Sequence, residues 1–296
     1  MAIDEYLRLR AAQIDGALAD WAAERGPSVE SRLLEAMAYS LRSPGKRIRP
    51  ILVLASAEAT GVDSAPLLPF ACAVEMVHAY SLVHDDLPAM DDDDLRRGRP
   101  TNHKIFGEAL AILAGDALLT EAFVVMSATA DRSLSAERRL AAMSELAIAA
   151  GAQGMVGGQT ADILAEGVAA ELDRVESIHK RKTGALLRAA VRIGGILAGA
   201  PAAELDSLSR YGDAIGLAFQ IADDLLDEVG DSGRTGKNTG RDRELAKSTY
   251  PARLGVAGAR LRLRELLDRA LAVLGGFAPC ADPLRDIARM IASRAL

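Results

Sequence analysis

The chain has 296 residues, a formal net charge of -6 and an apolar share of 50%. A negative net charge gives no overall attraction to nucleic acid, so we expect its basic clusters to act locally. Cys72 and Cys280 are too few and too far apart for a metal pair or a disulfide framework, and we expect both to be reduced.

The residue usage favours helices over sheets. Aromatic residues make up only 4% of the chain, and alanine and leucine are abundant. Apolar residues recur at helical spacing almost everywhere, and no strand pattern is found. We therefore predict one all-α domain over residues 1–296. Helices are expected around 30–42, 46–60, 66–87, 107–130, 136–165, 171–199, 203–228, 252–275 and 282–294.

The N-terminus lacks the features of an export signal. It carries charge throughout and has no apolar core of the kind found in signal peptides. The richest apolar stretch, Ile193 to Ala203, is short, and no stretch is judged long and apolar enough to span a bilayer. We expect a cytoplasmic enzyme or binding protein without membrane insertion.

The segment FACAVEMVHAYSLVHDDLPAMDDDD has helical periodicity up to a carboxylate-rich end. Asp85 and Asp86 fall near the C-terminus of this helix, where the helix dipole is already negative, so a compensating cation is expected. A solvated acidic loop is the alternative. No glycine or glutamate stands where a calcium EF-hand needs it, whereas carboxylates followed by arginines suit Mg²⁺ and phosphate.

A second acidic helix end occurs in GLAFQIADDLLDEVGD. Gln220, Asp223, Asp224 and Asp227 are spaced i, i+3, i+4 and i+7 and share one face, which alone could simply be solvated. Two such clusters on facing helices of a bundle would form a metal site that clamps a diphosphate.

Basic residues gather in three further places. GKRIRP holds Lys46, Arg47 and Arg49, HKRKTG holds Lys180, Arg181 and Lys182, and Lys237 and Lys247 come after the second acidic stretch. Each alone would be an ordinary solvated surface, but together they suit phosphate oxygens. GRTGKN does not fit a P-loop, because the first glycine and the Ser/Thr are missing.

From about Leu41 to the C-terminus, these motifs resemble, in order, the trans-isoprenyl diphosphate synthases (polyprenyl synthetases). GGQTAD and GKNTGRDRELAKSTYP extend the likeness. It implies a single all-α bundle around a central cavity, usually a homodimer, and Mg²⁺-dependent head-to-tail prenyl transfer. The expected reaction joins isopentenyl diphosphate to dimethylallyl or geranyl diphosphate and gives farnesyl diphosphate. A geranylgeranyl or geranyl product, a non-catalytic subunit, a terpene cyclase and an acidic scaffold are the alternatives.

The resemblance also assigns site residues. Asp85, Asp91, Asp223, Lys182 and Lys237 would be catalytic, and Phe219 and Gln159 would line the cavity. Tyr80 would form the floor that limits product length, with Ser81 beside it. Mg²⁺ would be held by Asp85, Asp86, Asp91, Asp223, Asp224 and Asp227. The allylic diphosphate would meet Arg96, Lys182, Thr183, Gln220, Lys237 and Lys247, and isopentenyl diphosphate would meet Gly45, Lys46, Arg49, His78 and Arg97.

Overall fold

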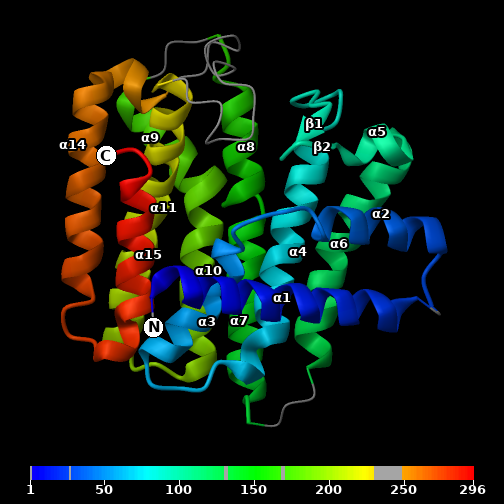
Figure 1. Cartoon of the computed structure of the whole chain (residues 1–296), viewed down its shortest axis with the longest axis horizontal. Coiled ribbons are helices and arrows are strands. Elements are labelled where there is room, and N and C mark those ends of the chain that lie inside the picture. Colours follow the sequence, from blue (N-terminus) through cyan, green and yellow to red (C-terminus); the bar gives the residue numbers. More distant parts are fainter. Residues whose placement is uncertain (1, 27, 130–132, 168–170, 230–248) are drawn as a thin grey trace. The chain divides into compact units, whose positions relative to one another are not determined.

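A computed structural model describes residues 2–26, 28–129, 133–167, 171–229 and 249–296 (Figure 1). The chain divides into two compact units, one of Met1–Ile51 with Ala65–Leu134 and one of Leu52–Ser64 with Ser135–Leu296. The predicted lysines Lys237 and Lys247 lie outside the described residues. That both units form one domain remains a prediction.

The first unit is built around two antiparallel neighbours, α4 and α6, which pack side by side. Phe70 and Met76 of α4 are fully buried, and alanines lie between them, so neighbouring helices approach closely. A short hairpin, β1–β2, comes after the acidic end of α4. The elements are α1 (Ile3–Arg25), α2 (Ser31–Leu41), the start of α3 (Ile48–Ala59), η1 (Ala65–Leu67), α4 (Leu68–Asp85), β1 (Leu95–Arg96), β2 (Arg99–Pro100), α5 (Asn102–Phe106) and α6 (Glu108–Ala128).

The second unit packs α10 and α14 against α11. Gly194 of α10 lies against the carbonyl of Val53, where an added Cβ would overlap the oxygen. Tyr211 of α11 is fully buried and its hydroxyl donates to the Leu284 carbonyl at 2.6 Å. The elements besides the rest of α3 are α7 (Ala136–Ala150), α8 (Met155–Ile163), α9 (Leu172–His179), the π-helical turn η2 (Lys180–Gly184), α10 (Ala185–Ala198), α11 (Ala202–Val229), α14 (Tyr250–Val273), η3 (Pro279–Ala281) and α15 (Asp282–Ser293).

The all-α prediction is confirmed, with three local corrections. A helix, α1, precedes residue 30, where none was predicted, and two two-residue strands form a hairpin. The helix predicted over 136–165 is two helices, because residues Gly151 to Gly154 interrupt it. An added Cβ at Gly154 would overlap the Ala149 carbonyl, so this tight break needs glycine.

The expectation of no membrane-length apolar stretch is wrong by length and composition. Among the described residues, three stretches reach that threshold: Ala65–Asp85, Glu108–Ala128 and Ala136–Ile163. The apolar window of the first is 67% buried inside the structure, but the other two are only 33% buried. Leu113 on α6 and Leu140 on α7 are more than half exposed, so the core of each helix's own unit leaves these faces uncovered.

Candidate active site

The first acidic motif folds back onto the helix end that precedes it. The Asp91 N–H donates to the Asp85 carbonyl at 2.8 Å, and the Asp92 N–H donates to the Leu87 carbonyl at 3.1 Å. Val83, Leu87 and Ala111 form a buried apolar cluster under the loop. The loop therefore places Asp91 beside Asp85, and both residues are partly exposed.

Asp86, by contrast, is buried and paired. Its Oδ1 accepts from Nε of Arg96 at 2.6 Å and lies 2.5 Å from Nη2 of the same guanidinium. Arg96 Nη2 also lies 3.4 Å from Asp93 Oδ2. Such a two-point contact fixes the plane of the guanidinium. The acidic loop thus holds in place an arginine predicted to bind diphosphate.

In the GKRIRP loop, one of the three basic side chains points into the protein. Arg47 donates to Asp15 Oδ1 at 2.8 Å, to Glu75 Oε1 at 2.6 Å and to the Leu41 carbonyl at 2.6 Å. Both Arg47 and Glu75 are buried. Arg47 therefore anchors the loop, while Lys46 is exposed and Arg49 is half-buried.

His78 sits in a strongly positive setting. Burial and the charges of Arg49, Arg97, Arg96 and Arg47 hold its pKa well below the ordinary value, so the ring is neutral at pH 7. Arg49 Nη1 lies 3.4 Å from His78 Nε2, and a guanidinium can only donate, so Nε2 carries the lone pair. Such a concentration of arginines is typical of a site for a polyanion.

The hairpin arginines are fixed by contacts with α2 and the GKRIRP loop. Arg97, at φ 54°, donates from Nη1 to the Pro44 carbonyl at 2.6 Å. A Cβ on Gly45 would overlap that same Nη1, so a larger residue there would force the end of the Arg97 side chain to move. Arg99 lies 4.3 Å from the centre of the Tyr39 ring, and this cation–π contact ties the hairpin to α2.

Tyr80 lies on α4 five residues before Asp85, or about 7.5 Å along the helix axis at the usual rise per residue. It is 6% exposed, and its ring meets that of His84 edge-on at 5.8 Å. Burial and the charge of Asp85 raise its pKa to about 12, so the phenol is neutral. Ser81 donates to the His78 carbonyl at 2.9 Å and stays a small, half-buried neighbour.

In the second unit, Lys182 belongs to the π-helical turn and lies against α8. Its Nζ donates to Asp162 Oδ2 at 2.6 Å. A Cβ at Gly158 would overlap the Lys182 backbone, so glycine at this position allows the two helices to touch.

A chain of hydrogen bonds continues from this turn. The Thr183 hydroxyl donates to Gln220 Oε1 at 2.8 Å, and Gln220 Nε2 donates to Asp224 Oδ1 at 2.9 Å. The backbone N–H of Tyr250 donates to Asp224 Oδ2 at 3.1 Å. The Thr183 hydroxyl is thereby held toward α11 by Gln220.

Asp224 is buried, and burial raises its pKa to about 7. The negative charges of Asp223 and Asp162 act in the same direction, while the hydrogen bonds from Gln220 and Tyr250 oppose the shift. Both Asp224 carboxylate oxygens accept hydrogen bonds inside the protein, from Gln220 and from the Tyr250 backbone. Asp224 therefore links α11 to the start of α14.

Asp223 lies nearer the surface and meets the C-terminal arginine. Arg294 Nη1 is 3.1 Å from Asp223 Oδ1, and the guanidinium carbon is 5.5 Å from the centre of the Phe219 ring. The Asp223 side chain is 39% exposed. The positive guanidinium of Arg294 therefore lies beside Asp223, a predicted metal ligand. Asp227, one turn later, is half-exposed on the same helix.

Two residues of this region were not assigned a role from the sequence. Asp162 stands in the GGQTAD segment and meets Lys182, and Arg294 meets Asp223. The sequence holds one signal for Asp162, the double glycine Gly157–Gly158 one turn before it. Two glycines lower helix propensity, which indicates a close contact at this point of the helix. Gln159, predicted to line the cavity, has a buried Oε1 without a hydrogen-bond partner among the described residues.

The donor set suits magnesium. Asp85 and Asp91 offer hard carboxylate oxygens from adjacent positions, and the Asp223 carboxylate is partly exposed on α11. Magnesium is held by one or two protein carboxylates together with water and substrate phosphates, which such partly open groups allow. The fixed guanidinium of Arg96 beside the first set matches phosphate geometry.

These features define an all-helical protein whose carboxylate-bearing helix ends and fixed arginines suit a polyanionic substrate. A model of the polyprenyl synthetase family matches residues 30–273, and the chain belongs to this family.

Individual relatives agree over nearly the full length. The chain is 44% identical over 295 residues to farnesyl diphosphate synthase of Geobacillus stearothermophilus, covering 99% of this chain and 98% of the relative. It is also 44% identical over 291 residues to a chloroplastic geranylgeranyl pyrophosphate synthase of Catharanthus roseus, covering 98% and 80%. A solved apo structure of an FPP/GFPP synthase from Zymomonas mobilis aligns with a TM-score of 0.87 at 39% identity, over 98% of each chain.

Proposed function

We propose that this chain is an Mg²⁺-dependent prenyltransferase that joins isopentenyl diphosphate to dimethylallyl or geranyl diphosphate and gives farnesyl diphosphate. Family membership and full-length similarity to a farnesyl diphosphate synthase support the reaction class. The observation that carries the proposal is the acidic loop, where Asp91 folds onto Asp85 beside an arginine fixed by Asp86.

In the proposed reaction, the allylic C–O bond breaks and its electron pair leaves with the diphosphate. The isopentenyl double bond attacks the allylic carbon, and the departing diphosphate takes the proton that is lost. Magnesium held by Asp85 and Asp91, and magnesium held by Asp223, would neutralise charge that develops on a diphosphate leaving group. Arg96 in the first unit and Lys182 in the second are each assigned to diphosphate oxygens, because preorganised cations stabilise charge most where water is excluded.

The second diphosphate needs its own cationic group. We assign it to Lys46, Arg49 and Arg97, with neutral His78 beside Arg49. A neutral ring adds a hydrogen-bonding group to this set without a further repelling charge. Thr183 and Gln220, which are hydrogen-bonded to each other here, are both assigned to the allylic diphosphate.

Overall similarity favours the farnesyl product, because a relative named for it is 52% identical to this chain, against 46% for a relative named for a geranylgeranyl product. The residue below the first motif points the same way. Tyr80 is a buried aromatic about one and a half turns before Asp85, which favours a short product. Geranylgeranyl or geranyl diphosphate synthesis is the alternative within the family, and a non-catalytic subunit is a more distant one.

One incubation separates these possibilities. The purified chain is given labelled isopentenyl diphosphate, Mg²⁺ and either dimethylallyl or geranyl diphosphate, and products are separated by chain length. We expect farnesyl diphosphate from both primers. A longer or shorter end product selects the alternatives, whereas no product from the chain alone, with activity restored by a second protein, identifies a subunit. Asp85→Ala, assayed in parallel, controls for contaminating synthase.

We further propose that the enzyme is a cytoplasmic homodimer without membrane insertion. On α6, Ile112, Leu113 and Val124 are 44%, 55% and 38% exposed. Three large apolar side chains are many for a helix face in water, and a second copy of the chain packed on this face would bury them. Light scattering after gel filtration should give twice the chain mass for the wild type, and Leu113→Glu should shift it toward the monomer. Fractionation of cells tests the compartment.

A further inference from the structure

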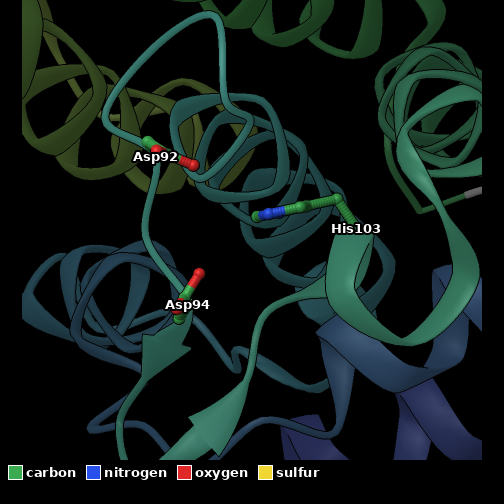
Figure 2. Close-up of side chains that lie close together, drawn as sticks. All are labelled: Asp92, Asp94 and His103. Carbon is green, nitrogen blue, oxygen red and sulfur yellow. The ribbon is translucent and has the colours of Figure 1, made fainter.

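Asp92, Asp94 and His103 form a cluster that the proposed reaction does not use. One potential ligand atom from each side chain lies within 4.8 Å of the other two. Figure 2 shows both carboxylates and the His103 ring directed toward the same space. The aspartates are exposed, whereas His103 is only 6% exposed.

Contacts of Thr101 define the state of the His103 ring. The Thr101 hydroxyl donates to the Asp93 carbonyl at 2.7 Å. Its oxygen also lies 3.2 Å from His103 Nδ1. Because a hydroxyl has a single proton, the oxygen accepts in the second contact and Nδ1 carries the hydrogen. In the neutral ring, Nε2 then carries a lone pair.

This lone pair has no donor facing it among the described residues. Nε2 of His103 is buried and has no hydrogen-bond partner in the part of the chain that the structure describes. The carboxylates of Asp92 and Asp94 are acceptors too, so three acceptors converge without a donor among them. Buried polar atoms normally have a partner, and here a cation would satisfy all three groups at once.

We propose that Asp92, Asp94 and His103 bind a divalent transition-metal ion of the Zn²⁺ type. Imidazole nitrogen combined with carboxylate oxygen suits Zn²⁺ better than it suits Mg²⁺. Bonds of about 2.0–2.2 Å are needed, and the two aspartates lie at the surface, where their side chains can close in on the buried ring. The site is separate from the six aspartates predicted to hold magnesium.

Lys104 is the competing cation at this site. Its Nζ lies 2.6 Å from Asp94 Oδ1 at the surface, so metal binding must share or release that carboxylate. Asp94 immediately precedes β1 and His103 comes after β2 in α5, so the ion would close the base of the hairpin. It would thereby brace the segment that carries Arg96 and Arg97.

Calorimetric titration of the metal-stripped full-length chain with Zn²⁺ in excess Mg²⁺ tests the site. We expect one Zn²⁺ per chain in the wild type and a loss of affinity of about ten-fold or more in Asp92→Asn and His103→Gln. Lys104→Met should tighten binding, because the competing cation is gone. Asp20→Asn, at an exposed position on α1, is the matched control and should bind like the wild type.

Two further measurements distinguish loss of the proposed Zn²⁺ site from loss of the magnesium residues and from misfolding. Asp223→Asn should retain Zn²⁺ binding, which separates this site from the magnesium residues and from the proposed reaction. Zn²⁺ should raise the melting temperature of the wild type but not of Asp92→Asn, an exposed change that tests the site even where His103→Gln does not fold. Absence of Zn²⁺ binding in excess Mg²⁺, or unchanged binding in Asp92→Asn, would overturn the proposal.

Discussion

The buried phenol of Tyr80 gives the sharpest test of product control. Tyr80→Ala removes a ring that lies below Asp85 and is only 6% exposed. Losing a buried aromatic to alanine costs about 3–5 kcal/mol in a core, partly because a cavity remains. In a synthase, that same cavity would admit the tail of a growing product, so the end product should lengthen by at least one isoprene unit.

The assay combines chromatography of labelled products with thermal melting. At about 2–4 °C per kcal/mol for a chain of this size class, Tyr80→Ala should melt about 6 °C or more below the wild type. Tyr80→Met, which fills much of the ring's volume with a flexible side chain, should cost less stability and still lengthen the product. If both variants fold and both still stop at farnesyl diphosphate, Tyr80 is not the floor.

Three other outcomes are expected from the same contacts. Asp85→Ala and Asp223→Ala should each reduce turnover by orders of magnitude while leaving the melting temperature nearly unchanged, and a near-wild-type rate in steady-state assays would contradict the metal clamp. Because folding lowers the pKa of His78, the unfolded chain binds the proton first, so stability should fall as pH drops through about 6.5, the unfolded value. Urea titrations of wild type and His78→Gln between pH 5 and 8 measure this, and equal pH slopes would count against it. Arg294→Gln should tighten Mn²⁺ binding at Asp223 by about two- to five-fold, given the usual strength of partly exposed ion pairs. Electron paramagnetic resonance titration reports this, and weaker binding would mean that Arg294 does not compete with the ion.

The helices and the acidic motifs could be predicted because their signals are local. Apolar spacing along α4 and α11 marks the buried faces, and the aspartates stand out because they end apolar segments. Asp85 and Asp91 are close in the sequence, and the loop needed only to fold back on itself to bring them together, as the Asp91 N–H bond shows.

The basic residues illustrate what one sequence cannot separate. GKRIRP presents Lys46, Arg47 and Arg49 as equivalent charges, yet Arg47 is buried against Glu75 and Asp15, which are 28 and 32 residues away. Which side chain turns inward depends on partners brought together only by tertiary packing. Arg47 also has a φ of 50°. A positive φ is uncommon for a residue other than glycine, and no local pattern announces it here.

Ion pairs between residues that are distant in the sequence could not be predicted either. Arg294 and Asp223 stand far apart in the sequence, and their contact forms because α15 packs on α11. The missed α1 has a different cause. Its apolar and polar residues are poorly segregated around the helix, with Tyr6 and Ile14 buried among many exposed neighbours, so periodicity gave little guidance.

The π-helical turn at Lys180–Gly184 lies in an unbroken rod that runs from Leu172 to Ala198. Such a turn holds one residue more than a regular helix needs, and the helix on either side of it keeps its own register. Deleting a single residue here would leave a smoother rod and an intact core downstream, but it would swing the Lys182 amine away from Asp162. Such a deletion would therefore leave thermal stability nearly unchanged and strongly reduce catalytic activity.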